Sequence, residues 1–400
     1  MPAMNRRRFL SAAGLGSLAA AACQAPPAPD QAAANVVVTG LEIFRVRVNQ
    51  RGNWVIPRIQ TSAGVSGIGD ASHAGEGDPQ IAKLQDFFEL IQGRGIHDIE
   101  WLRGQVQPEI AKFGRAASCA FSGIEQALFD IQGKIAGVPS YQLFGGKLRE
   151  TIRNYANINR STDPRDAAGF AAMAGRAVEF GFDAVKLAPF DGMPLGGSAS
   201  EIAAHTRQGV DCVRAVREAM GDREVLIDAH GNFDLERGLG LLKQMEPFGL
   251  FWLEEVSESL EHLAAIRKAA AMPTAGGESL YGLKENAEYV TAGAADILMP
   301  DVKYCGGMLE LKKIAALAEG FGLPVAPHGP ASPVGNVAAA HVCAGLPNFQ
   351  ILEFSFGETD WRAELIDPPE EVLGGYMRVG GRPGLGIELN EKTARRYAVD

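Results

Sequence analysis

The chain has 400 residues, of which 46% are hydrophobic and 22% charged, with five cysteines and a formal net charge of −10. It is too apolar for a disordered chain and too poor in cysteine for a disulfide-stapled one. The negative charge argues against a nucleic-acid partner. The length fits two or three ordinary domains, or one large barrel with an appended domain.

Residues 1–34 are predicted to be an export signal and a tether. Paired arginines within 6–8 precede a short apolar run, which is the pattern of twin-arginine export to the periplasm. The run ends at Cys23, where a lipid could be attached; cleavage near Ala22 that leaves this thiol free is the alternative. The Pro- and Ala-rich segment 25–34 is typical of a tether. The only membrane contact expected is therefore an N-terminal lipid anchor.

Residues 35–150 are predicted to form an α+β capping domain. Alternating apolar residues predict strands, and apolar residues at helical spacing predict helices. The expected strands cover 36–48, 54–61 and 65–70, and the expected helices cover 79–92 and 115–136. The tail, 365–400, has Gly-rich turns and no strand–helix rhythm. We expect it to pack on this domain and complete it.

Residues 151–364 alternate short apolar strands with helical segments. The expected strands cover 152–158, 182–189, 225–230, 250–256, 274–280, 296–302, 324–328 and 350–354. Eight strands separated by seven helices predict an α/β fold with parallel strands, a modified TIM barrel of the (β/α)7β type. In such a barrel the functional side chains lie at the C-terminal ends of the strands.

Six of these strands end in an ionisable residue. In chain order they are Asp228, Glu254, Glu278, Asp301, His328 and Glu353. Successive members lie 26, 24, 23, 27 and 25 residues apart, which is about one βα unit, so each repeat delivers one group to the same rim. A single acid after a strand is usually a helix N-cap. Several together would repel one another unless a cation lay among them.

The three consecutive acids Asp228, Glu254 and Glu278 suit a hard divalent cation such as Mg²⁺. Glu255 is the alternative to Glu254, but it should point to the other side of its strand. His230 shares the strand face of Asp228. It should therefore lie in the pocket close to the metal; a third metal ligand is the alternative.

Asp301 and His328 end neighbouring strands. A carboxylate beside a histidine orients the ring and raises its basicity, which suits a general base near neutral pH. A cap and a core histidine are the structural alternatives for these two residues.

The pattern resembles the enolase superfamily and, within it, the mandelate racemase-like group. The resemblance runs from about residue 36 to the end. Its motifs are VSGIGDA at 65–71, WLEE at 252–255, Pro300-Asp301 followed by Gly306-Gly307, and PGLGIE at 383–388. It implies Mg²⁺ as the cofactor on the three acids and Asp301 with His328 as the base dyad. It also implies that Glu353 hydrogen-bonds the substrate carboxylate or its enolate.

Lys186 resembles the first lysine of the family's Lys-x-Lys element, which would stabilise the enediolate. Ala188 replaces the second lysine, so the second base of a mandelate-type racemase is missing. Instead, Asp228-Ala-His230 resembles the Asp-x-His element of galactonate and mannonate dehydratases. This implies a carbon–oxygen lyase that removes the proton alpha to a carboxylate. It would dehydrate an aldonic or aldaric acid to a 2-keto-3-deoxy acid, with His230 protonating the departing hydroxyl.

Two alternatives stay open. An epimerase, racemase or cycloisomerase acting on a sugar acid or its lactone would use the same metal and dyad. A non-catalytic periplasmic sugar-acid binding protein would keep the barrel without turnover. In each case the expected partner is a small carboxylate, and we expect a homo-oligomer.

Overall fold

The computed structural model describes residues 36–49, 52–73 and 78–399. The predicted export signal and tether at 1–34 lie outside these residues. Within the described part of the chain, no helix is both long and apolar enough to cross a membrane.

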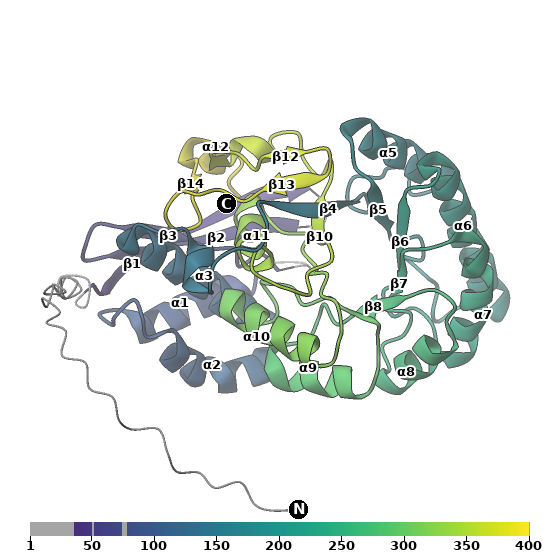
Figure 1. Cartoon of the computed structure of the whole chain (residues 1–400), viewed down its shortest axis with the longest axis horizontal. Helices are drawn as coiled ribbons and strands as arrows, with labels where there is room; N and C mark the ends of the chain where they lie inside the picture. Colours follow the sequence, from purple (N-terminus) through teal and green to yellow (C-terminus); the bar gives the residue numbers. More distant parts are fainter. Residues whose placement is uncertain (1–35, 50–51, 74–77, 400) are drawn as a thin grey trace, which may run out of the picture. The chain divides into compact units, whose positions relative to one another are not determined.

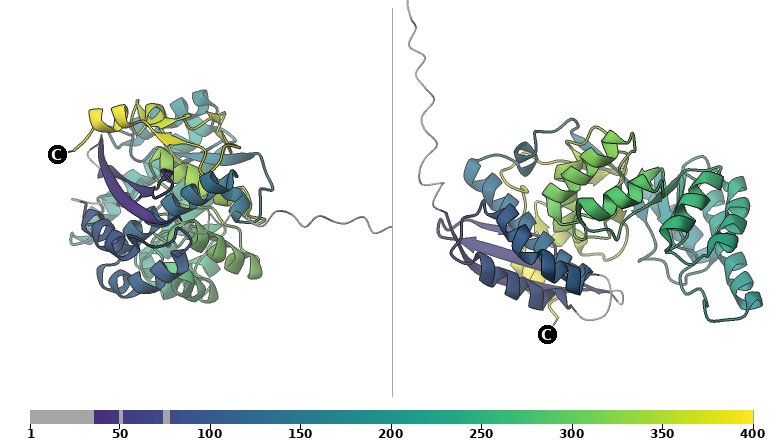
Figure 2. Two further views of the ribbon diagram at one scale, coloured as in Figure 1. Left: turned by 90° about the vertical axis from the view of Figure 1, so that its left-hand side faces the viewer. Right: turned by 90° about the horizontal axis from the view of Figure 1, so that it is seen from below.

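The first part of the described chain is a three-stranded antiparallel sheet with helices packed on it (Figure 2). Its elements are β1 (Val38–Asn49), β2 (Gly52–Thr61), β3 (Ser66–Ile68), α1 (Gln80–Ile91), α2 (Ile99–Phe113), α3 (Arg115–Ala136) and α4 (Ser140–Leu143). Gly67 and Gly69 let β3 lie directly on α3, because a Cβ at either position would collide with a carbonyl oxygen of the helix. This contact explains the two glycines of the VSGIGDA motif.

The helix α2 was not predicted. It contains Gly104 and Pro108, which obscure the helical pattern in the sequence. The helix nevertheless forms, because one of its faces is buried. The buried residues on that face are Ile99, Leu102, Val106 and Ile110.

The second part is a barrel of parallel strands with helices on the outside (Figure 1). Its strands are β4 (Thr151–Asn157), β5 (Ala184–Leu187), β6 (Glu224–Asp228), β7 (Trp252–Glu254), β8 (Thr274–Gly276), β9 (Ile297–Leu298) and β10 (Leu352–Ser355). Each pairs in parallel with the next from β4 to β9, and β10 closes the ring by pairing with β4. The modified TIM barrel predicted from the sequence is confirmed.

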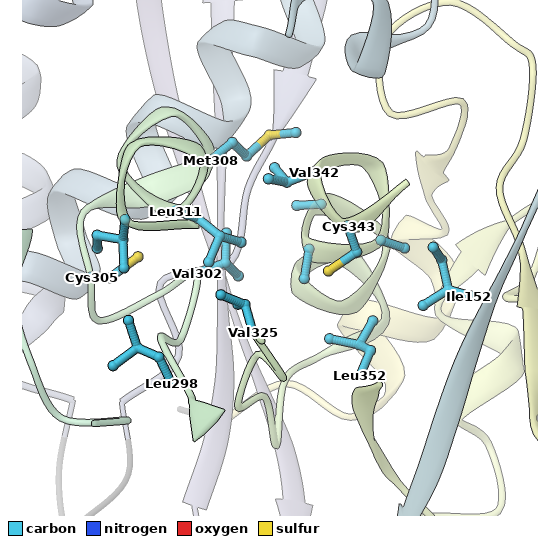
Figure 3. Close-up of a cluster of buried hydrophobic side chains, with 14 of the residues drawn as sticks. Ile152, Leu298, Val302, Cys305, Met308, Leu311, Val325, Val342, Cys343 and Leu352 are labelled. Carbon is cyan, nitrogen blue, oxygen red and sulfur yellow. The ribbon is translucent and has the colours of Figure 1, made fainter. Parts of the chain in front are cut away.

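One predicted strand, 324–328, is shorter than expected. Only Val325 bridges its neighbours, in parallel with Leu298 on one side and with Phe349 on the other. Figure 3 shows Val325 among buried side chains that include Leu298, Leu352 and two cysteine thiols. The wall therefore stays closed by packing where the hydrogen-bonded ladder is minimal. The four described cysteines, Cys119, Cys212, Cys305 and Cys343, are buried free thiols.

Seven helices follow the strands. They are α5 (Ala167–Phe180), α6 (Ala199–Met220), α7 (Leu235–Met245), α8 (Leu260–Ala269), α9 (Gly282–Thr291), α10 (Gly307–Gly320) and α11 (Pro333–Cys343), with a 3₁₀ turn η2 (Glu246–Phe248) after α7. Five of them begin at a side-chain cap, which ends each loop from the strand rim sharply. These caps are Asp166, Ser198, Asp234, Ser259 and Ser332.

The tail contains more regular structure than expected. After the 3₁₀ turn η3 (Arg362–Glu364), its elements are β11 (Ile366–Asp367), β12 (Val372–Leu373), β13 (Tyr376–Arg378), β14 (Glu388–Leu389) and α12 (Glu391–Arg396). The end of the tail lies on the first sheet, where Arg47 donates its N–H to the carbonyl of Tyr397. However, β13 pairs antiparallel with the first residues of β4. The tail therefore contacts the barrel too, at the end opposite the rim where the strands terminate.

Candidate active site

The eight residues predicted for the site lie together at the C-terminal rim of the barrel. Most of them follow, by two residues, an apolar side chain of the barrel interior. Because side chains alternate between the two faces of a strand, the site residue points to the same inner face as that apolar residue. These pairs are Ala184 and Lys186, Leu226 and Asp228, Trp252 and Glu254, Met299 and Asp301, Ala326 and His328, and Ile351 and Glu353. Glu278 departs from this spacing after Gly277, whose φ of +99° turns the chain.

Asp228, Glu254 and Glu278 form a cluster of carboxylates. Each offers one oxygen such that the three lie within 4.8 Å of one another. Burial and the charge of Asp228 raise the pKa of Glu254 well above its usual value; burial and neighbouring acids, with Glu255 foremost, do the same for Glu278. Three oxygen donors with this repulsion, two of them buried, fit a hard divalent cation, whose charge would offset it.

Glu255 stands outside this cluster. Its carboxylate accepts a hydrogen bond from the N–H of Gly277 at 3.1 Å. This agrees with the prediction that it points away from Glu254. Its backbone has a φ of +40°, and His230 has a φ of +46°; within the described chain they alone among non-glycine residues adopt such values. Backbone strain of this kind concentrates at functional sites.

Lys186 is buried among the carboxylates. Its Nζ lies 3.1 Å from both oxygens of Glu254, 3.3 Å from Glu353 and 3.7 Å from Asp228. Burial alone would lower its pKa, but the charges of Glu254 and Glu353 hold it well above its usual value. Lys186 is therefore a fixed positive charge beside the acidic cluster. Ala188, at the position of the missing second lysine, is buried.

His328 and Asp301 form a hydrogen-bonded pair. Nδ1 of His328 lies 2.8 Å from Oδ2 of Asp301, and the same oxygen accepts from Nζ of Lys303 at 3.0 Å. Nε2 of His328 faces the acidic cluster, 3.1 Å from Glu278. With its proton on Nδ1, the ring presents a basic Nε2 to the pocket. Lys303 was not predicted, although it lies two residues after Asp301.

His230 lies on the other side of Asp228. Its N–H donates to Oδ1 of Asp228 at 3.0 Å, its Nε2 lies 2.9 Å from Oδ2, and its Nδ1 contacts Asp191. Burial would lower its pKa, but the Asp228 charge and the contact with Asp191 raise it to about 11. Asp191 belongs to the segment 190–198, whose role the sequence did not reveal.

Glu353 is fully buried and held by donors. Its oxygens accept from Tyr155 at 2.9 Å, from the N–H of Gly329 at 3.1 Å and from Asn157. Burial would raise its pKa, but Lys186 and other donors bring it below its usual value. As a carboxylate it can only accept. Donation to a substrate, which the resemblance implies, would require a proton that these contacts disfavour.

A cavity of about 240 Å³ opens onto this site. Five of the predicted site residues line it: Lys186, Asp228, His230, Glu278 and His328. The other lining residues were not predicted; they are Arg115, Asn157, Asn159, Arg160, Tyr304 and Pro330. Asn157 ends β4, and Asn159 and Arg160 follow it; the end of this strand carries no acid or histidine that could mark it in the sequence. Arg115 begins α3 in the first part of the chain, and no local pattern relates it to the rim.

The comparisons with known proteins agree with this geometry. Residues 40–145 match the mandelate racemase / muconate lactonizing enzyme N-terminal domain, and residues 169–393 match the enolase C-terminal domain-like family. The D-xylonate dehydratase of Haloferax volcanii is 32% identical over 87% of this chain and 86% of its own length. The D-galactarolactone cycloisomerase of Agrobacterium fabrum is 30% identical over 90% of this chain and 95% of its own.

A crystal structure shows the same fold. The mandelate racemase/muconate lactonizing enzyme-like protein from Rubrobacter xylanophilus superimposes with a TM-score of 0.83 at 34% identity. The alignment covers 92% of this chain and 98% of that one. The similarity therefore extends over both the first sheet and the barrel.

Proposed function

Because the chain belongs to the mandelate racemase / muconate lactonizing enzyme family of the enolase superfamily, we propose that it is a Mg²⁺-dependent sugar-acid dehydratase. The substrate would be an aldonic or aldaric acid and the product a 2-keto-3-deoxy acid. The observation that carries the proposal is a base dyad and a second histidine facing one cavity beside a carboxylate cluster.

Asp228, Glu254 and Glu278 would hold the metal ion. A divalent cation bound there would ligate the substrate carboxylate and offset the negative charge that develops on it. Lys186 adds a second positive charge that the protein itself supplies, and Glu353 keeps it in place at 3.3 Å. Mg²⁺ is favoured because all three donors are carboxylate oxygens.

The proton transfers follow from the two histidines. Nε2 of His328 takes the proton from C2, while Asp301 keeps the ring oriented through Nδ1. The electron pair of that C–H bond moves onto the substrate carboxylate, which gives an enediolate. It then forms the C2=C3 double bond as the C3–O bond breaks. His230 gives its proton to the departing oxygen, and water leaves. The resulting enol gains a proton at C3 and becomes the 2-keto acid.

A cycloisomerase is the second candidate, because one relative carries that name. It would also abstract the proton at C2, but a ring oxygen instead of hydroxide would leave. The product would then keep the mass of the substrate. Product mass therefore separates the two reactions.

The test uses the chain from residue 35 with Mg²⁺ in D₂O, incubated with a panel of aldonic and aldaric acids. Proton NMR follows the C2 proton, and mass spectrometry follows the loss of water. We expect both events in the wild type and neither after EDTA. His328→Asn should abolish both, whereas His230→Asn should keep C2 exchange and stop water loss. The control is His97→Asn, which changes an exposed histidine that does not line the cavity.

Full dehydration by His230→Asn would refute the assignment of the acid. Exchange without loss of water in the wild type would favour the epimerase or cycloisomerase. Turnover that EDTA leaves unchanged would refute the metal site. Metal-dependent binding of a sugar acid without any exchange would indicate the binding protein.

Export by the twin-arginine route, lipidation of Cys23 and assembly into a homo-oligomer are proposed on the sequence alone. Fractionation of cells that express the full chain, with Cys23→Ala as the comparison, tests the first two. Light scattering on the purified chain tests the third. Recovery in the cytoplasm, or a monomer, would refute the corresponding proposal.

A further inference from the structure

Arg115 brings a positive charge from the first part of the chain into the active-site cavity. It lines the cavity together with Lys186 and His328. One guanidinium nitrogen donates to the hydroxyl of Ser279, and the group lies 4.6 Å from the centre of the Tyr304 ring. These contacts hold the side chain on the rim. They leave donors of the five-hydrogen guanidinium fork for another acceptor.

Arg115 differs from the other cations of the cavity in lacking a carboxylate partner. Lys186 contacts three acids, and Arg160 pairs with Glu358 at 2.9 Å. Among the residues that the structure describes, no acid lies within ion-pair distance of Arg115. Of the lysine and arginine side chains that line the cavity, Arg115 is therefore the one without a carboxylate partner among the described residues.

Arg115 and Lys303 both act on the neighbouring His73. Burial lowers the pKa of the nearby His73, and the charges of Arg115 and Lys303 lower it further. Lys303 is already paired with Asp301, with Nζ and Oδ2 3.0 Å apart. An anion placed at this end of the cavity would meet a guanidinium that no described carboxylate pairs with. Planar carboxylates match that group with two parallel hydrogen bonds.

The position of Arg115 relative to the base suggests which part of a substrate it meets. The Tyr304 ring that carries Arg115 also lies 5.9 Å from the His328 ring. Arg115 is thus on the side of the base dyad, and its partner Ser279 directly follows Glu278 of the carboxylate cluster. A substrate bound at the cluster by its first carboxylate would extend past the base toward the guanidinium.

We infer that the substrate is an aldaric acid, and that Arg115 is a specificity-determining residue that binds its distal carboxylate. This inference rests on the proposed function and narrows it to dicarboxylates. Relatedness alone does not decide the point, because the names of the relatives include both a xylonate dehydratase and a galactarolactone cycloisomerase. An aldonic acid would present a neutral hydroxyl to the guanidinium and forgo the ion pair.

The test compares acids that differ only at the distal carbon, namely galactarate with galactonate and glucarate with gluconate. Binding is measured by calorimetry with Mg²⁺ on the His328→Asn protein, so that no turnover intervenes, and kcat/KM is measured on the protein with His328. We expect Arg115→Gln to weaken aldarate binding and kcat/KM about 10- to 100-fold, the worth of a charge-assisted pair. Binding of the aldonates should stay as it is. Arg115→Lys should restore part of the aldarate binding.

Arg103→Gln is the matched control. Arg103 also projects from the first part of the chain toward the barrel, but it pairs with Glu100 and Glu310 and does not line this cavity. It should leave the preference between the two acids unchanged. Thermal unfolding of each variant shows whether the fold is kept.

If Arg115→Gln weakened the binding of aldarates and aldonates equally, the inference would be overturned, since Arg115 would then only hold Tyr304 and Ser279 in place. So would a wild type that prefers the aldonates, although dehydration of those acids would leave the proposed function standing. Absence of C2 exchange with every acid would refute the proposed function and the inference with it.

Discussion

The proposed metal site depends on a hydrogen bond beneath one of its ligands. Trp252 is fully buried in β7, and its Nε1 donates to Oε2 of Glu254 at 3.0 Å. Its ring packs edge-on against Tyr155, with the ring centres 5.5 Å apart. Trp252→Phe keeps an aromatic ring there and removes the N–H. Outer partners of this kind orient a metal ligand, and losing one typically costs 10- to 100-fold in metal affinity, or about 1.4–2.7 kcal/mol.

The assay is calorimetric titration of EDTA-treated protein with Mg²⁺, for the wild type and the variant. The control for the smaller ring is Trp54→Phe, because Trp54 is equally buried and its Nε1 has no hydrogen-bond partner within the described chain. We expect weaker Mg²⁺ binding in Trp252→Phe and unchanged binding in Trp54→Phe. Wild-type affinity in a folded Trp252→Phe protein would show that Glu254 is not a ligand whose orientation this bond controls.

Two further predictions concern stability. His341 is buried and accepts from the N–H of Tyr141 at 3.2 Å; burial lowers its pKa from 6.5 to about 4. The neutral ring therefore stabilises the fold above pH 6.5, and this stability, about 3 kcal/mol in all, is lost as the pH falls toward 4. Urea unfolding at pH 7 and pH 5 should show about 2 kcal/mol of this loss in the wild type and a smaller loss in His341→Gln; equal losses would refute the assignment. Lys303→Met leaves the Asp301 charge buried without its ammonium partner, so the unfolding free energy should fall by about 3–5 kcal/mol. Lys147→Met, which breaks an exposed pair, should cost at most about 1 kcal/mol, and equal costs in both variants would contradict the argument.

The rim of the barrel could be predicted because its geometry repeats along the chain. One βα unit returns the backbone to the same end of the barrel, so residues such as Asp228 and His328 meet although 100 positions separate them. The inward direction of each side chain follows from the strand period of two. Where a strand is short, the spacing still holds: Val325 makes only one bridge to each neighbour, and His328 nevertheless reaches the pocket.

The contacts that were missed come from outside this repeat. Arg115 reaches the cavity from α3, a helix packed on the first sheet, and Asp191 reaches His230 from a long loop after β5. Their positions depend on how separate elements pack, which no local spacing encodes. The same holds for β13, which pairs with β4, a contact that the expected packing of the tail on the first domain did not include.

Two non-glycine residues with left-handed backbone conformations follow β6 and β7, and one of them sets the position of the second histidine at the rim. His230 and Glu255 are the first or second residues beyond metal-cluster carboxylates on adjacent strands, and the N–H of Gly231 bonds to the carbonyl of Glu255. A regular strand would carry His230 past Asp228 along the barrel wall. The turn at φ +46° instead folds the ring back onto Asp228, where a proton donor faces the cavity that the base also lines. The strained turn thus places a second histidine beside the cluster. A dehydratase needs such a second group to protonate the departing hydroxyl, whereas simple proton exchange at C2 does not.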